Sequence, residues 1–236
     1  MSVIYLIRHG QASFGEDNYD KLSDLGVRQS EIVAQRLADH GVKFDSVITG
    51  TLQRQIHTAQ ALYDAYDKKG LELPERKTMP EFNEYPSDEV LLGYLPRLEA
   101  REPSLAEHFD KIYTDRRSFQ LVFEKAMQTW ASGQDDVPGI TPWLEFTATV
   151  NKGLDAIMAS HGSGTNVAVF SSGGPISVAL QRTMHLSHER TMEVSWQVMN
   201  ASITRLKFSG NRINLYAFNQ FGHLEAVKDK TVLTYR

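Results

Sequence analysis

The triplet Arg8-His9-Gly10 closes an apolar run near the start of the chain and sets a cation beside an imidazole. A neutral imidazole can attack phosphorus, and the phosphohistidine that forms divides one difficult transfer into two easier steps. A guanidinium offers a planar fork of donors that matches the oxygens of phosphate. The triplet therefore predicts a nucleophilic His9, with Arg8 binding the phosphoryl oxygens and Gly10 leaving room for the ligand.

Two further predicted strand ends carry groups suited to the same chemistry. Arg54 lies in the first turns of the helix that is predicted after the second strand. Glu84 follows the third predicted strand, among apolar and aromatic neighbours that would keep a carboxyl protonated and able to act as a general acid. Glu81 and Glu89 lie nearby, and spacing alone does not exclude either of them as the acid.

The fourth predicted strand ends in Ser171-Ser172-Gly173-Gly174 and leads into a helix. Hydroxyls and backbone amides there meet the positive end of the helix dipole, which favours an anion. The residues expected to bind the substrate are therefore Arg8, Gln11, Arg54, Ser172 and Gly173.

The elements that would position these groups follow from the apolar patterns. Residues 3–7 are β-branched and aromatic without polar alternation, which is typical of a strand buried on both faces of a parallel sheet. Further strands are predicted at 44–49, 78–82 and 166–170, with a hairpin at 203–208 and 213–218. Helices are predicted to begin at the cap Ser23, at Thr51, near Thr141 and at Pro175.

Residues 88–140 carry long, charged helical patterns with no strand signal up to residue 130, which we interpret as an inserted helical cap. Strands that alternate with helices predict a three-layer α/β/α fold with a mostly parallel sheet. We expect one domain over residues 1–236 that carries this cap. In such sheets ligands bind beyond the carboxyl ends of the strands, where the candidate residues fall.

Composition narrows the function classes. The 236 residues are 41% hydrophobic and 23% charged, as in an ordinary globular protein. A formal net charge of -4 argues against a broad basic face for nucleic acid. The absence of cysteine excludes disulfides, thiolate metal sites and cysteine nucleophiles. The apolar run at 3–7 is too short for a signal peptide or a membrane span, so a cytoplasmic location without membrane association is expected.

No metal or other cofactor is expected. The sequence has neither a His-Glu-x-x-His helix nor a calcium loop, and it has no Gly-Lys-Ser/Thr phosphate loop. Phe14, Tyr85, Tyr94 and Tyr113 are candidate lid aromatics, which core packing explains equally well. No feature of the sequence indicates an oligomeric state.

The chain resembles the histidine phosphatase superfamily, also called phosphoglycerate mutase-like, whose signature is Arg-His-Gly after the first strand. The resemblance extends beyond the triplet but not to residues 88–138. The similar segments are 22–29, 44–59, 82–84, 167–176, 200–206 and 219–224.

The resemblance implies that His9 is phosphorylated, that Arg8 and Arg54 bind the phosphoryl group and that Glu84 protonates the leaving oxygen. One position departs from the family pattern, because Ser172 stands where a second histidine is usual. A preorganised donor that faces developing charge is worth roughly 10²–10³ in rate, so this departure bears directly on activity.

The leading hypothesis is a metal-independent phosphatase that hydrolyses phosphate monoesters of small molecules or proteins through phosphohistidine on His9. A phosphoglycerate mutase ranks second, because Gln11-Ala12-Ser13-Phe14-Gly15 differs from the Glu-Ser-x-Trp-Asn continuation typical of the mutases. The alternative from another class is a module that recognises phosphate in the same pocket but is catalytically weak, because Ser172 replaces the usual second histidine. A serine hydrolase based on Ser172 is disfavoured, because Phe170 stands where the nucleophile elbow needs glycine.

Overall fold

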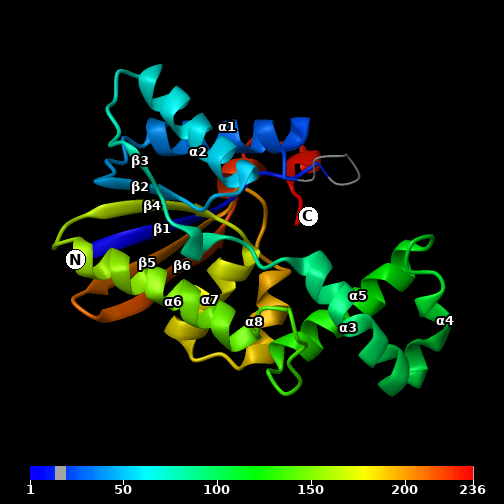
Figure 1. Cartoon of the computed structure of the whole chain (residues 1–236). Helices are drawn as coiled ribbons and strands as arrows, with labels where there is room; N and C mark the ends of the chain where they lie inside the picture. Colours follow the sequence, from blue (N-terminus) through cyan, green and yellow to red (C-terminus); the bar gives the residue numbers. More distant parts are fainter. Residues whose placement is uncertain (14–19, 236) are drawn as a thin grey trace.

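Helices cover both faces of a six-stranded sheet in the order β3-β2-β4-β1-β5-β6 (Figure 1). The computed structural model describes residues 1–13 and 20–235. Strands β3, β2, β4 and β1 run parallel, whereas β5 runs antiparallel to β1 and to β6. The predicted α/β class, the mostly parallel sheet and the closing hairpin are confirmed. The strands are β1 (Ser2–Arg8), β2 (Ser46–Thr49), β3 (Arg76–Thr78), β4 (Asn166–Ser171), β5 (Ile203–Ser209) and β6 (Arg212–Gln220).

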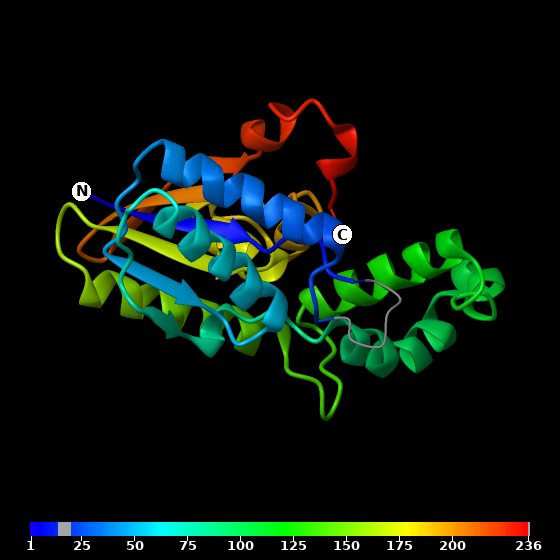
Figure 2. The same cartoon turned by 90° about the horizontal axis from the view of Figure 1, so that it is seen from above.

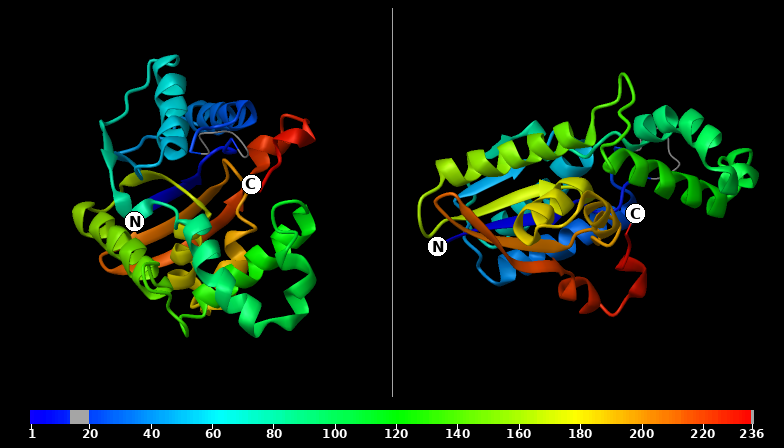
Figure 3. Two further views of the ribbon diagram at one scale, coloured as in Figure 1. Left: turned by 45° about the vertical axis from the view of Figure 1, so that its right-hand side comes forward. Right: turned by 90° about the horizontal axis from the view of Figure 1, so that it is seen from below.

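The central strand β1 is buried on both faces because its side chains alternate between two cores. Ile4 and Leu6 belong to the core that the sheet forms with α6 (Trp143–Ser160) and α7 (Gly173–Met184). Ile7 belongs to the opposite core, formed with α1 (Asp24–Asp39) and α2 (Gln53–Asp67). The view from below in Figure 3 shows α6 and α7 lying across the face opposite α1 and α2.

The predicted helix starts are confirmed within a few residues. Ser23 is the N-cap of α1, with its Oγ accepting a 3.0 Å hydrogen bond from the amide of Gly26. Helix α7 begins at Gly173, two residues before the predicted start at Pro175. The sequence did not predict α8 (His188–Ser195) or the short α9 (Gly222–Glu225). Among residues 1–13 and 20–235 no helix combines the length and apolar character needed to cross a bilayer.

The prediction of a third strand at 78–82 is wrong. Strand β3 ends at Thr78, which pairs with Thr49 of β2, and residues Pro80–Phe82 form a short 3-10 helix. Pro80 has no amide hydrogen for a strand ladder, and its fixed φ suits the first turn of a helix. This turn buries Phe82 completely and directs the following residues toward the end of β4.

A helical cap extends beyond the carboxyl ends of the strands, where Figure 2 shows it projecting from the sheet. It consists of α3 (Ser87–Arg101), α4 (Ala106–Phe109) and α5 (Arg116–Ala131). An aromatic cluster joins it to α6: the ring centroid of Trp130 lies 4.8 Å from that of Tyr85 and 5.0 Å from that of Trp143. Because these rings are buried, the cap is held at the edge of the sheet that carries the candidate residues.

Candidate active site

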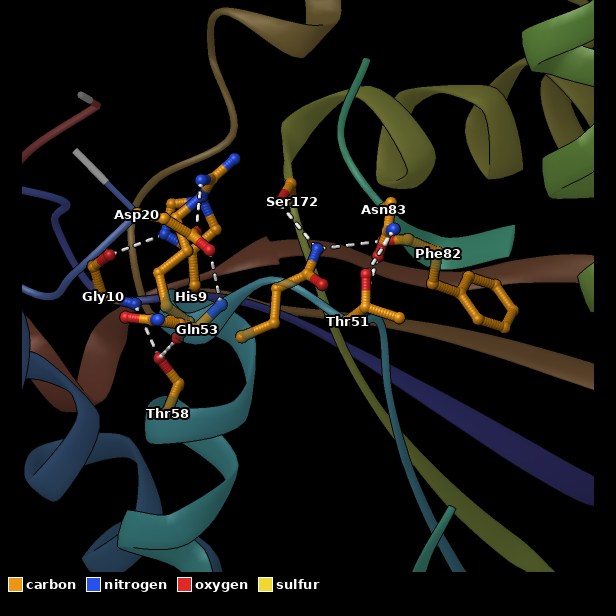
Figure 4. A network of polar contacts seen from close by, with 11 residues as sticks. His9, Gly10, Asp20, Thr51, Gln53, Thr58, Phe82, Asn83 and Ser172 are labelled. Atoms are coloured by element: carbon orange, nitrogen blue, oxygen red, sulfur yellow. Dashed lines mark hydrogen bonds and ion pairs between the residues drawn. The ribbon is translucent and has the colours of Figure 1, made fainter. Parts of the chain in front are cut away.

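His9 follows the carboxyl end of β1 and is almost completely buried, at 5% exposure. Its Nδ1 lies 2.6 Å from the carbonyl oxygen of Gly10, so the ring hydrogen is on Nδ1 and donates to that oxygen. The lone pair is therefore on Nε2, where Nε of Arg54 donates a hydrogen bond of 3.2 Å. Figure 4 shows His9 within this network. The tautomer and the ring orientation therefore direct the lone pair of the imidazole at Arg54.

The electrostatic surroundings keep His9 neutral. Burial lowers the pKa of His9 well below its ordinary value of 6.5, and the positive charges of Arg54 and Arg8 lower it further. The carbonyl of Gly10 opposes this shift without reversing it. The imidazole therefore holds its lone pair at neutral pH, as a nucleophile toward phosphorus requires.

Gly10 is required by the protein's own backbone. A Cβ at this position would lie 2.2 Å from the carbonyl oxygen of Gly26, and a Cβ at Gly26 would lie 2.0 Å from the carbonyl oxygen of Gln11. The amide of Gly10 donates to Oγ1 of Thr58 at 3.1 Å. The close contact between this loop and α1 therefore explains the glycine, whereas the sequence had suggested room for a ligand.

Arg54 lies in the first turn of α2, 7% exposed, with its guanidinium directed at His9. Its Nη1 forms an ion pair of 2.7 Å with Oδ1 of Asp20. The other oxygen of Asp20 accepts a 2.7 Å bond from the amide of Gln53, at the start of α2 (Figure 4). Asp20 therefore fixes both the guanidinium and the end of the helix that carries it.

Glu84 is the carboxyl that the fold brings to this site. Both of its oxygens lie 3.1 Å from the amide nitrogen of Gly174, and Oε1 also accepts from the amide of Tyr85 at 3.2 Å. Burial raises the pKa of Glu84 above its ordinary value of 4.5, although these amides and the charges of Arg54 and Arg8 oppose the rise. Of the two competing carboxyls, Glu89 is exposed in α3 and Glu81 lies against α6 at Gly153.

Ser172 and Gly173 lie at the N-terminus of α7, and both are buried. Oγ of Ser172 accepts a 2.9 Å hydrogen bond from Nε2 of Gln55. A Cβ at Gly173 would approach the carbonyl oxygen of Ser195 to 3.1 Å. The next amide, that of Gly174, is bonded to Glu84, so the helix terminus that the sequence suggested for an anion holds a carboxyl in this structure.

Arg8 and Gln11 are half-buried and flank His9 and Gly10 in the sequence. Nη1 of Arg8 donates to the backbone carbonyls of Val198 and Tyr235, the latter at 2.8 Å. The side-chain oxygen of Gln11 accepts a 3.0 Å bond from the hydroxyl of Ser23. The Arg8 charge nevertheless acts on both His9 and Glu84, since it contributes to the pKa shifts of both.

The candidate lid aromatics lie in different surroundings. Tyr85 and Tyr94 are buried in the core between the cap and α6, whereas Tyr113 is 78% exposed. Phe14 lies outside the described residues.

Several polar residues of the site were not among the predicted site residues. Asp20 pairs with Arg54, Gln55 donates to Ser172, Thr58 accepts from Gly10, and Nδ2 of Asn200 donates to the carbonyl of His9 at 3.2 Å. Most of these partners are distant in the chain, so no local spacing relates them. The positions of Gln55 and Thr58, directly after Arg54 and one turn further along the same helix, indicated that both could lie near the site.

A comparison with models of protein families matches residues 4–86 and 100–220 to the histidine phosphatase superfamily, branch 1. The chain belongs to the histidine phosphatase superfamily. The match includes the Arg8-His9-Gly10 triplet, Arg54, Glu84 and the start of α7. It also includes α4 and α5, so the expectation that residues 88–138 lie outside the resemblance is wrong from residue 100 onward.

Related proteins of this superfamily include mutases and phosphatases. Phosphoglycerate mutase from Schizosaccharomyces pombe is 25% identical over 181 residues, which are 73% of this chain and 80% of that protein. The crystal structure of a phosphoserine phosphatase mutant from Entamoeba histolytica in complex with phosphoserine has a TM-score of 0.64 at 19% identity, over 95% of this chain and 100% of that chain. Phosphoglycerate mutase from Bacillus anthracis str. Sterne has a TM-score of 0.61 at 16% identity, over 97% of both chains. These solved structures establish the phosphoglycerate mutase-like fold.

Proposed function

We propose that this protein is a phosphatase that hydrolyses phosphate monoesters through a phosphohistidine on Nε2 of His9, without a metal ion. The observation that carries the proposal is the His9 geometry: Nδ1 donates its hydrogen to Gly10, and the lone pair on Nε2 accepts a hydrogen bond from Arg54, which would bind the phosphoryl group. The half-buried Glu84, with its raised pKa, supplies a general acid.

The reaction proceeds in two steps. Nε2 of His9 attacks phosphorus and forms the P–N bond while the P–O bond to the alcohol breaks. Protonated Glu84 donates its proton to the leaving oxygen. In the second step the Glu84 carboxylate removes a proton from a water molecule, the water oxygen attacks phosphorus, and the P–N bond breaks. Arg54 and Arg8 bind the phosphoryl oxygens in both steps because their charge matches the charge on those oxygens.

The proposed substrates are phosphorylated small molecules or phosphorylated proteins, and the proposed location is the cytoplasm. Similarity to a phosphoserine phosphatase in complex with phosphoserine supports a phosphate monoester as the substrate. The net charge of -4 disfavours nucleic acid as a partner.

A phosphoglycerate mutase is the second candidate, and the mutase relative from Schizosaccharomyces pombe is the observation that favours it. The two functions differ in the acceptor of the phosphoryl group, which is water in a phosphatase and a substrate hydroxyl in a mutase. Residues 11–15 lack the continuation typical of the mutases, so we rank hydrolysis first.

The test traps the phosphoenzyme in the presence of EDTA. The protein is mixed with a radiolabelled phosphate monoester, quenched in alkali and passed over a gel-filtration column. We expect label that stays with the protein in alkali and is lost in acid, as a phosphoramidate requires. Phosphate release in water identifies the phosphatase, whereas conversion of 3-phosphoglycerate to 2-phosphoglycerate without phosphate release identifies the mutase. Loss of activity with EDTA would contradict the metal-independent mechanism.

A protein that binds phosphate but forms no phosphoenzyme with any ester would instead be a recognition module. Its phosphate binding would still depend on the same arginines, so binding alone does not establish the phosphatase. Label on the protein is the result that separates the two.

Replacing Arg54 with alanine is expected to weaken the binding of inorganic phosphate and to lower kcat/KM by about 10²–10³-fold, because the buried guanidinium faces the atom that carries the phosphoryl group. The measurements are calorimetric phosphate binding and steady-state kinetics. The matched control is Arg28→Ala, which removes an exposed arginine paired with Asp229. Equal effects of the two variants would contradict a specific role for Arg54.

A further inference from the structure

Gln55 and Ser172 form a polar pair beside the proposed nucleophile, and both residues are 0% exposed. Nε2 of Gln55 donates to Oγ of Ser172 and to the backbone carbonyl of Phe82, at 2.9 Å in each case (Figure 4). These bonds use both hydrogens of the carboxamide nitrogen. The hydroxyl of Ser172 is therefore an acceptor toward Gln55, and its own hydrogen points elsewhere.

The backbone of Ser172 lies next to that of His9. Arg8 pairs with Ser171 across the parallel strands β1 and β4, and the amide of His9 donates to the carbonyl of Ser171 at 2.9 Å. Ser172 follows Ser171 as His9 follows Arg8, so the two residues extend neighbouring strands at the same level. Within the described part of the chain, the Ser172 hydroxyl donates no hydrogen bond to the protein. The hydrogen of this fully buried hydroxyl therefore has no acceptor among the described residues.

Gln55 also connects this donor to the proposed acid. The carbonyl of Phe82, two residues before Glu84, accepts from Gln55 and from Oγ of Ser171 at 2.8 Å. Glu84 is in turn held by the amide of Gly174, two residues after Ser172. One carboxamide on α2 therefore contacts both segments, but the acid segment is also held without it, by the bonds from Ser171 to Phe82 and from Gly174 to Glu84.

The carboxamide is held at a cost in stability. Oε1 of Gln55 is buried with no hydrogen-bond partner among residues 1–13 and 20–235. A buried acceptor without a partner destabilises a fold, and such costs are characteristic of functional sites. The two bonds of Nε2, rather than the needs of the core, account for the orientation of this side chain.

We propose that Gln55 is a positioning residue that makes the Ser172 hydroxyl a fixed donor to the phosphoryl oxygens. The pair then occupies the place where the superfamily resemblance expects a second histidine. A fixed donor stabilises the charge that develops on those oxygens, and Gln55 acts only through the direction it gives to that donor. This inference rests on the proposed phosphoryl transfer at His9.

The test is a double-mutant cycle. Ser172→Ala is expected to lower kcat by about 10²-fold with a smaller change in KM, because the lost bond is strongest in the transition state. Gln55→Ala is expected to lower kcat by about 10-fold. The double variant is expected to match Ser172→Ala within about twofold, since Gln55 has no effect once the hydroxyl is gone. A double variant whose kcat falls by the product of the two single-variant losses would overturn the proposal. An unchanged kcat in Ser172→Ala would overturn it as well.

Two controls separate positioning from a general loss of structure. Gln60→Ala removes an exposed carboxamide from the same helix, where it bonds Asp64, and is expected to keep wild-type kinetics. Ser172→Thr keeps the hydroxyl and is expected to retain more activity than Ser172→Ala. Thermal unfolding of each variant shows whether it is folded, and a kinetic loss that simply follows the melting temperature would contradict the proposal.

A replacement of the pair provides an independent test. Nε2 of Gln55 lies 2.9 Å from Ser172 Oγ, so an imidazole at position 172 needs the space that the carboxamide fills. Ser172→His alone is expected to reduce kcat at least about 10-fold, and Gln55→Ala/Ser172→His is expected to recover wild-type kcat or exceed it. A fully active Ser172→His single variant would show that the carboxamide is not in the way.

Failure of the function and failure of the pair give different results. If the wild-type protein turns over no ester, the proposed phosphatase fails, and the cycle is repeated on the affinity for inorganic phosphate. If the loss of phosphate-binding free energy in the double variant is smaller than the sum of the two single losses, the pair is supported as a positioned phosphate donor. If it equals that sum, the pair is overturned. If the wild type turns over esters but the kinetic losses multiply, the phosphatase stands and the pair fails.

Discussion

Replacing His9 with alanine is expected to lower the rate of phosphate-ester hydrolysis by about 10⁴-fold or more and to abolish the alkali-stable label on the protein, because His9 carries the phosphoryl group in the proposed mechanism. His9 is buried and its Nε2 is the atom that faces Arg54. The measurement is single-turnover hydrolysis together with trapping of the phosphoenzyme.

The structure offers a matched control in His57, an exposed histidine of α2. His57→Ala is expected to keep wild-type activity and wild-type labelling. Label that persists in His9→Ala would place the intermediate on another residue and refute the assigned nucleophile. A His9→Ala protein that binds phosphate but neither turns over nor labels is the result that the mechanism requires.

Replacing Glu84 with glutamine is expected to lower kcat/KM by about 10²–10⁴-fold for an alkyl phosphate, because an alkoxide leaves slowly unless it receives a hydrogen. The loss is expected to be much smaller for p-nitrophenyl phosphate, whose leaving group is stable without one. This dependence on the leaving group separates an acid from a residue that only supports the fold. The exposed Glu89→Gln is the control and is expected to affect neither substrate.

The pH dependence of kcat/KM provides a second test of Glu84 as the general acid. Burial raises its pKa above 4.5, and the reaction needs the protonated form, so kcat/KM is expected to fall as pH rises through the raised pKa. The low pKa of His9 means that acid inhibits only well below pH 6.5. The alkaline fall should be absent in Glu84→Gln. A wild-type profile with no alkaline fall would contradict the role of Glu84 as the acid.

The same shift makes stability depend on pH. The Glu84 carboxyl binds its proton more tightly in the folded state than in the unfolded chain, because its pKa is raised on folding. Its contribution to the free energy of unfolding therefore decreases as pH rises from about 4.5 through the raised pKa. Glu84→Gln removes that contribution. The variant is therefore expected to gain stability relative to the wild type across this interval, and denaturant unfolding at several pH values measures the difference.

The sequence by itself determined the α/β class and indicated His9, Arg54 and Glu84 as candidate residues, while leaving Glu81 and Glu89 open as the acid. It could do so because apolar strands and amphipathic helices have distinct periods, and because parallel strands bring their carboxyl ends to one edge. Where a local rule competed with the apolar pattern, the pattern misled: residues 78–82 look like a strand, but Pro80 begins a 3-10 turn.

Only the tertiary structure decided which groups hold these residues in place. Asp20 reaches Arg54, Gln55 reaches Ser172 and Gly174 reaches Glu84 through contacts between segments that lie far apart in the chain. Such contacts leave no period or spacing in the sequence, because each depends on how separate elements pack. The pKa values of His9 and Glu84 were equally undetermined by sequence, since burial is the largest cause of both shifts and burial exists only in the folded chain.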